Sequence, residues 1–262
     1  MLRAAVRDGL AAARAAGLRA YAVAVLSYLP AVGADLTGNI LLVLAGLIVQ
    51  VVVSFALIRV LGAFRPVPVP APPQVDDQGR RVLPPREPGP PLTAGDRRVR
   101  VALRNAFALW RPGLSFTGLV LLAQVGALLA VLALSGGKAT DYSSNVLLLS
   151  AVPVSALFMA FLLLAPQRIA LEGETRVVVA VAHSVRIART TYPLLLLLTV
   201  LEPLLMALAA LLVPDKDPSL ALAAGVGGGA ALLASVLQVL TTAVANEVYL
   251  AGPRLELPAE AG

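Results

Sequence analysis

The fold of this chain is decided by the stretch Ala102-Leu-Arg-Asn-Ala-Phe-Ala-Leu-Trp-Arg111, in which arginines and apolar residues recur at helical spacing. Two similar stretches stand at Ala5-Val-Arg-Asp-Gly-Leu-Ala-Ala-Ala-Arg14 and Ala180-Val-Ala-His-Ser-Val-Arg-Ile-Ala-Arg189. Each runs into an apolar stretch, and a second apolar stretch follows. Such recurrence in fixed order indicates one structural unit repeated. The sequence therefore predicts an all-α integral membrane fold of three repeats, each an interfacial amphipathic helix plus a transmembrane helical hairpin.

The composition places most of this chain in lipid. Apolar residues make up 58% and charged residues 14%, against about 45–50% and about 25% in an ordinary soluble domain, and the mean hydropathy is +0.85. The chain has no cysteine, which excludes a disulfide framework and thiolate metal sites. The net charge of +6 does not indicate nucleic acid, because the arginines flank apolar stretches, where they orient the chain and meet anionic lipid.

Six apolar stretches are candidates for membrane spans, since a helix needs about 20 apolar residues to cross the bilayer. We expect six transmembrane helices near residues 20–34, 40–64, 114–134, 146–166, 194–213 and 220–250. The three repeats then cover residues 1–64, 97–168 and 172–251. A Pro-rich cytoplasmic linker, residues 65–96, follows the first repeat, and a cytoplasmic tail, residues 252–262, follows the third.

The arginines also predict the orientation of the chain. Most of them stand before the first span, between the second and third, between the fourth and fifth, and after the sixth. The positive-inside rule then places both termini in the cytoplasm of a multi-pass plasma-membrane protein. The dominance of Ala, Val, Leu and Arg over Lys is typical of a bacterial chain. An alternative for residues 1–34 is a cleaved signal peptide ending at Val32-Gly-Ala34.

The linker from Pro66 to Pro91 is rich in proline and poor in apolar surface. Such a composition cannot form a helix and predicts an extended, disordered cytoplasmic segment. It serves either as a spacer between the first two hairpins or as a docking site for a Pro-binding protein partner.

Arginines form the polar face of the amphipathic stretches. Between residues 97 and 111, apolar side chains that include Phe107 and Trp110 recur on the opposite face. This pattern predicts helices in the headgroup layer, with their guanidinium groups near anionic phosphates. Topology anchoring explains most of the pattern. Specific anionic-lipid binding is a second hypothesis, for which the candidates are Arg97, Arg100, Arg104, Arg111, Arg186 and Arg189.

Polar side chains inside the spans are the candidate binding residues. Glu202 lies near mid-span, where a carboxylate is costly unless it is protonated, paired or faces water. Ser27, Gln124 and Glu202 each stand thirteen residues after the last arginine of their repeat, which predicts one common depth. Gln50 and Gln238 lie within the second and sixth spans. We predict a polar midplane cluster, as in transporters, with interhelical hydrogen bonds that only stabilise the bundle as the alternative.

Motifs for catalysis are missing from the sequence. The single histidine, His183, aligns with Asp8 and Asn105 of the other repeats and fits the polar face of an interfacial helix. No cluster of His, Asp and Glu has metal-ligand spacing, and neither a nucleophile elbow nor a phosphate-binding loop occurs. We therefore expect no enzymatic activity, no metal and no cofactor.

One region resembles a known family. Pro166-Gln-Arg-Ile-Ala-Leu-Glu-Gly173, followed by Ala180-x-x-x-Ser-x-Arg-x-x-Arg189 and an aromatic-led apolar span, is similar to the six-helix membrane domain of some bacterial glycerophosphodiester phosphodiesterases. The resemblance is strongest over residues 145–214. It implies the six-helix fold, which that family also uses in stand-alone membrane proteins. Catalysis in those enzymes belongs to a separate soluble barrel, so the resemblance implies no activity here.

The sequence thus favours a non-enzymatic membrane protein, namely a scaffold, assembly or regulatory partner that contacts membrane lipids. The alternative is a small transporter or lipid-handling protein that works through the polar cluster around Glu202.

Overall fold

The computed structural model describes residues 2–26, 40–64, 90, 92–134, 155–211 and 220–251, and this part of the chain is helical, without strands. In chain order its elements are α1 (Leu2–Ala16), α3 (Ile40–Gly62), the 3₁₀ helix η1 (Ala94–Arg97), α4 (Val99–Phe107), α5 (Trp110–Leu134), α7 (Ala165–Glu172), α8 (Val177–Leu211) and α9 (Leu220–Ala251).

Within the described residues, four helices are long and apolar enough to cross a membrane: Trp110–Ala133, Ser155–Glu172, Val177–Leu205 and Gly228–Ala251. A fifth candidate is the pair Arg3–Ala16 and Leu18–Leu26, which is bent by 89°. The apolar part of α3, Gly46–Gly62, is shorter. The helical membrane architecture predicted from the sequence therefore agrees with the structure at this coarse level, with four or five candidate spans in the part that the structure describes.

The three amphipathic stretches end in different ways. Gly17 has a φ of +56°, which favours glycine, and here α1 ends and the chain turns sharply. After α4, a short turn at Ala108 and Leu109 leads into α5. The third stretch has no such turn, because α8 runs through Pro193 and Pro203 as one helix of 35 residues. The separate interfacial helix and span that we expected there form a single helix.

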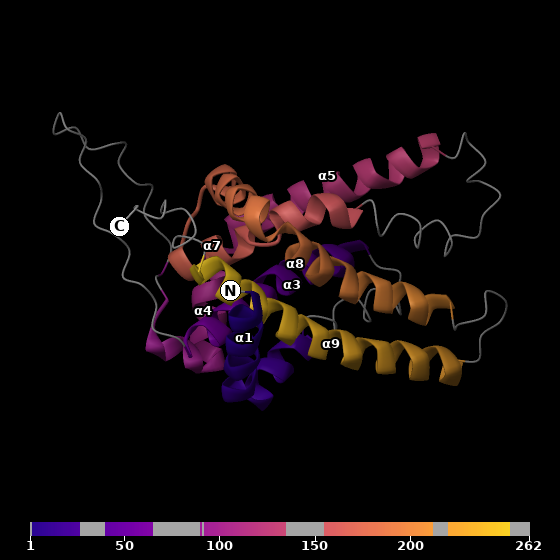
Figure 1. The fold of residues 1–262 in the computed structure, drawn as a ribbon. Helices are drawn as coiled ribbons and strands as arrows, with labels where there is room; N and C mark the ends of the chain where they lie inside the picture. Colours follow the sequence, from indigo (N-terminus) through magenta and orange to yellow (C-terminus); the bar gives the residue numbers. More distant parts are fainter. Residues whose placement is uncertain are drawn as a thin grey trace.

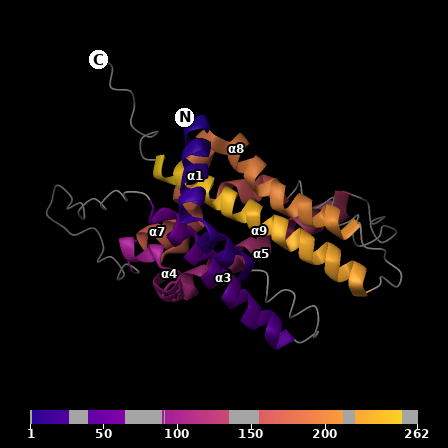
Figure 2. The ribbon, with the colours of Figure 1, turned by 90° about the horizontal axis from the view of Figure 1, so that it is seen from below.

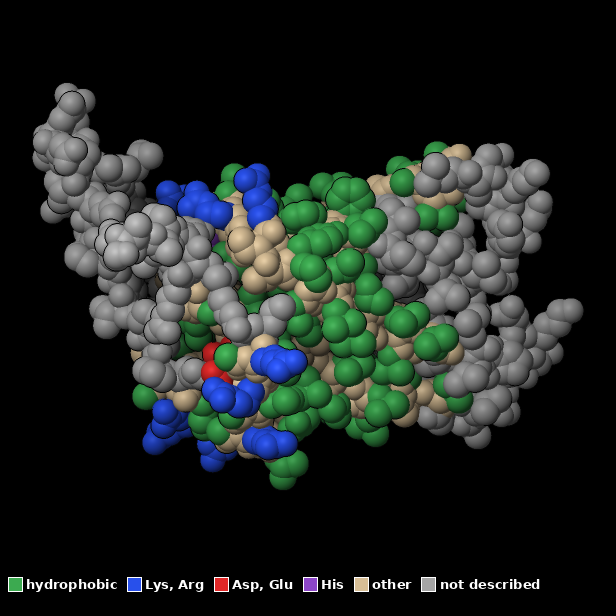
Figure 3. All heavy atoms as spheres, in the orientation of Figure 1, with side chains coloured by type: hydrophobic (Ala, Val, Ile, Leu, Met, Phe, Trp, Pro, Cys, Tyr) green, Lys and Arg blue, Asp and Glu red, His purple; other side chains and the backbone are tan. Residues whose placement is uncertain are grey.

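The helices diverge from one well-packed end of the bundle. Figure 1 shows α5, α8 and α9 extending away from the region where α1, α4 and α7 gather. At this end α3 packs against α4, α7 and α9, and α1 lies across α9, as Figure 2 shows from below. Gly9 permits the close contact, because a Cβ atom there would lie 2.9 Å from the backbone nitrogen of Val244. We call this region the arginine-rich end, since exposed arginines gather on it while apolar side chains cover the middle of the molecule (Figure 3).

The last residues of the expected linker, 94–96, belong to a described helix. Ala94–Arg97 is a 3₁₀ helix that packs against α3 and α4, and Asp96 within it is fully buried. The last three residues of the expected linker are therefore helical and packed, because Asp96 forms an ion pair with Arg59 of α3.

Candidate functional site

One groove in the described part of the chain lies among α5, the first part of the helix Ser155–Glu172, α8 and α9. It has a volume of about 620 Å³, and its wall is mostly apolar. Leu198, Val125 and Leu163 are typical of this wall. We call it the Glu202 groove, after the single charged side chain among its described lining residues. The polar side chains that line it are Gln124, Ser155, Thr199, Glu202 and Thr241.

The second groove, which we call the Gln50 groove, lies between α3 and α5. Its volume is about 340 Å³, and its polar lining residues are Gln50, Ser54, Thr117 and Gln124. Gln50 and Ser54 stand four residues apart on α3, so they share one helix face. The two grooves meet at Gln124 and Met159, which line both of them. Together they form one polar track bordered by apolar side chains.

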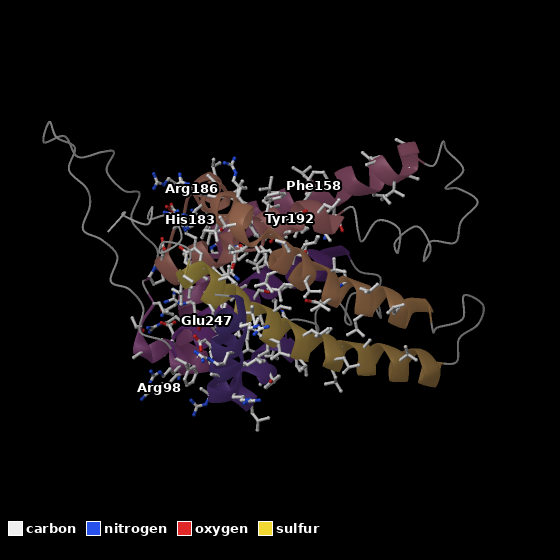
Figure 4. The ribbon with its side chains drawn as sticks, in the orientation of Figure 1. Arg98, Phe158, His183, Arg186, Tyr192 and Glu247 are labelled. Atoms are coloured by element: carbon white, nitrogen blue, oxygen red, sulfur yellow. The ribbon has the colours of Figure 1, made fainter. Side chains whose placement is uncertain are left out.

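Local sequence features shape both grooves. Gly113 lets α5 approach α3, because a Cβ atom at this position would lie 2.3 Å from the Val51 side chain. On the other side, the Tyr192 hydroxyl donates a hydrogen bond to the Leu157 carbonyl at 3.1 Å. The Tyr192 ring stacks on Phe161 with a centroid distance of 4.8 Å. Figure 4 shows Tyr192 beside the helix that carries Phe158, so this contact fixes the wall of the Glu202 groove against α8.

Pro203 changes the backbone hydrogen bonding of α8 beside the Glu202 groove. Proline has no backbone N–H, so the carbonyl of Thr199, four residues earlier, lacks its usual helical donor. The Thr199 hydroxyl does not supply this donor, because it donates to the carbonyls of Leu195 and Leu196, at 3.0 and 2.8 Å. Thr199, Glu202 and Pro203 all line the groove, so this carbonyl and the Glu202 carboxylate belong to one helical turn of its wall.

The structure brings some of the predicted midplane residues together and separates others. Gln124 and Glu202 both line the Glu202 groove. Gln50 lines the Gln50 groove, which shares Gln124 with the first groove. Gln50 and Gln124 are both exposed on the surface of the chain, and Glu202 is half-buried. Gln238 lines neither groove, although its carbonyl accepts a hydrogen bond from Thr241. Ser27 lies outside the described residues.

A buried ion pair at the arginine-rich end was missed by the sequence analysis. Arg59 of α3 and Asp96 of η1 are both 0% exposed, and two hydrogen bonds of 2.8 and 3.1 Å join them. Arg59 also donates to the carbonyls of Pro90 and Ala170, at 2.8 and 2.7 Å. One guanidinium group therefore ties α3 to the segment before α4 and to α7.

The Asp96 carboxylate accepts three further hydrogen bonds. They come from the backbone N–H of Thr93, the Thr93 hydroxyl and the Asn105 amide, at 2.8, 3.0 and 3.1 Å. Burial alone would raise the pKa of Asp96, but the hydrogen bonds from Arg59, Thr93 and Asn105 and the charge of Arg59 outweigh it and hold the pKa below its usual value.

Two sequence signals could have revealed this cluster. Arg59 interrupts the apolar stretch that we expected to span the membrane, and a charged residue there requires a partner. Thr93 and Asp96 have the spacing of a helix-capping pair, which predicts an ordered turn. Neither signal identifies the other residue as its partner, because the pair is 37 residues apart in sequence.

The arginines predicted to face lipid are all exposed. Arg97 lies over the Phe64 ring and Arg111 over the Trp110 ring, at 5.3 and 5.5 Å from the ring centroids. Phe107, on the same amphipathic stretch, is 60% exposed. Figure 3 shows blue arginine side chains around the arginine-rich end, where little acidic surface is visible. The exposed candidates are Arg97, Arg100, Arg104, Arg111, Arg186 and Arg189.

Several acidic side chains among the described residues at this end are buried or paired. Glu247 is buried in α9 (Figure 4), and the Tyr249 hydroxyl donates to Glu172. The Arg176 side chain lies 3.1 Å from Glu174. Burial would raise the pKa of Glu174, but hydrogen bonds from the side chain and backbone of Arg176 outweigh it and lower the pKa. Among the described residues, the exposed charge at this end is therefore mainly positive.

His183 makes a ring contact rather than belonging to a metal-binding cluster. Its ring lies edge-on to Tyr249, with the centroids 5.5 Å apart. Among the residues that the structure describes, no three His, Asp or Glu side chains are close enough to hold a metal ion.

In comparisons with known proteins, no family model, curated protein or solved structure matches this chain.

Proposed function

We propose that this chain is an integral membrane protein that binds an amphipathic, lipid-like molecule in the Glu202 groove. One observation carries the proposal. Glu202 and Gln124 line an apolar groove between helices that are long enough to cross a membrane. A pocket that is mostly apolar, with a few convergent polar groups, is the usual form of a small-molecule site.

The physical argument rests on where these polar groups lie. Lipid chains offer no hydrogen bonds, so a polar side chain at this depth costs free energy unless a polar group meets it. Gln50 and Gln124 are exposed on the surface of the chain that would face the bilayer. A ligand with polar atoms along one edge and an apolar body would satisfy both amides and fill the groove.

The exposed arginines determine the membrane orientation that we propose for the protein. We place the arginine-rich end at the cytoplasmic face of a bacterial plasma membrane, with six spans and both termini inside. The exposed arginines and the paired acids at that end support this orientation. The role is non-enzymatic, and lipid handling is favoured over the scaffold role because the described residues form a groove.

Native mass spectrometry of the protein in native nanodiscs tests the proposal. Wild type should carry a defined lipid or metabolite adduct that Glu202→Gln loses, since this variant keeps the size of the side chain and removes the charge. Ser235→Ala is the matched control, because it removes a polar group from the span of α9 outside both grooves. Identical spectra for all three proteins would refute ligand binding. A protein partner that co-purifies with all three, and needs residues 66–91, would favour the scaffold role.

A further inference from the structure

We infer that the ligand of the Glu202 groove is a bilayer phospholipid whose headgroup carries a primary ammonium group, an aminophospholipid, and that it enters along the Gln50 groove. This inference rests on the proposed function and names its substrate class.

The charge of the grooves selects the headgroup. Glu202 is the single ionisable side chain among the described lining residues of both grooves, and no Lys, Arg or His is among them. A carboxylate has about four acceptor positions, so it can bind an ammonium group in addition to its contacts within the protein. An anionic headgroup would instead bring a second negative charge beside Glu202, in a medium of low polarity that strengthens the repulsion.

The other polar groups of the Glu202 groove are suited to the same ligand. The Thr199 carbonyl, which Pro203 leaves without its helical donor, can only accept hydrogen bonds. A primary ammonium group has three N–H donors. It can therefore bind the Glu202 carboxylate and this carbonyl together, whereas a quaternary ammonium group satisfies the charge alone.

The Gln50 groove supplies the entry route. It reaches from Gly113 and Pro166, near the arginine-rich end, to Gln124, where the Glu202 groove begins. Arg111 stands two residues before Gly113 and is exposed, in a position to meet a lipid phosphate at the interface. Thr117 and Gln124 are seven residues apart on α5, so they share one helix face along the route. A headgroup can follow this track while its acyl chains stay against the apolar wall or in the bilayer.

Nanodiscs that contain equal amounts of phosphatidylethanolamine, phosphatidylcholine and phosphatidylglycerol test the inference by native mass spectrometry. Wild type should retain the three lipids in that order, with at least about a fivefold preference for the ethanolamine lipid over the glycerol lipid. Glu202→Gln should abolish this preference, and Glu202→Asp should keep it, because the shorter side chain preserves the charge. Ser235→Ala should behave as wild type.

The outcomes separate this inference from the proposed function. If Glu202→Gln loses all adducts but wild type shows no headgroup preference, the inference of an aminophospholipid is wrong, while the proposed binding of an amphipathic molecule stands. Adducts that no variant changes would overturn both. Gln124→Leu provides a second variant at the junction of the two grooves and should reduce the bound lipid even if Glu202→Gln fails to fold. Full retention of the ethanolamine lipid by Gln124→Leu would overturn the entry route.

Discussion

Replacing Asp96 by asparagine leaves the positive charge of Arg59 buried without its partner. Both side chains are 0% exposed, and the variant loses the two hydrogen bonds that Arg59 donates to the carboxylate. The amide NH₂ group of asparagine would also face donors, either Arg59 or the groups of Thr93 and Asn105. Breaking a buried ion pair costs about 3–5 kcal/mol. We expect Asp96→Asn to fall within this range, since the carbonyls of Pro90 and Ala170 still accept from Arg59.

Thermal and denaturant unfolding in nanodiscs measure this loss. The chain has one tryptophan, Trp110, which begins α5 three residues after the end of α4, so its fluorescence reports on the region that Asp96 holds in place. Arg7→Gln is the matched control. It removes an ion pair whose arginine side chain is 79% exposed, and such pairs contribute about 0–1 kcal/mol.

A double variant tests the physical reason. Arg59→Met removes the buried charge, so Arg59→Met combined with Asp96→Asn should be no less stable than Asp96→Asn alone. If Asp96→Asn unfolds like wild type, or if the two substitutions simply add, the pair does not hold η1 against α3 and our reasoning is wrong.

Three further predictions concern acid, packing and lipid. Wild type should lose stability as the pH falls below about 4, because the ionised Asp96 carboxylate stabilises the fold and its pKa is lower in the folded than in the unfolded chain. The stabilisation is complete above the usual pKa of an aspartate and is lost as the pH falls through the lower pKa of the folded state. Acid titration of Asp96→Asn should show a weaker loss. Gly9→Ala should destabilise by about 1–3 kcal/mol, since its Cβ would meet the backbone of α9. Gly118→Ala, with open space around it, should stabilise by about 0.5–1 kcal/mol in the same melts. Joint replacement of Arg100 and Arg104 by alanine should lower the anionic-lipid content of nanodiscs, because each arginine contributes about 1 kcal/mol to the binding of an anionic lipid surface. An unchanged content would refute a lipid contact.

The sequence predicts helices well and their ends less well. Apolar stretches at residues 114–134 and 220–250 lie within α5 and α9, because a long apolar run has few alternatives to a helix. The break after α1 depends on the positive φ of Gly17, which the sequence allows but does not require. A proline usually ends or kinks a helix, yet α8 continues through Pro193, where it packs against α9 and α7.

The candidate site could be predicted in part. Repeat alignment placed Gln124 and Glu202 at one depth, and the structure lines one groove with both. The Gln50 groove depends on the crossing of α3 and α5 at Gly113, which is a tertiary contact that no periodicity contains. The same limit hid the pairing of Arg59 with Asp96, because residues 37 positions apart meet only after the chain folds.

Photo-crosslinking with a phosphatidylethanolamine that carries a diazirine near its headgroup tests the central claim most directly. Peptide mapping of the labelled protein should place the label within residues 117–128 and 198–203, the walls of the two grooves. Unlabelled phosphatidylethanolamine should compete, and Glu202→Gln should remove the label. Labelling confined to lipid-facing residues of α9 such as Leu232 and Leu233, which are exposed and line neither groove, or labelling unchanged in Glu202→Gln, would contradict a binding site in the Glu202 groove.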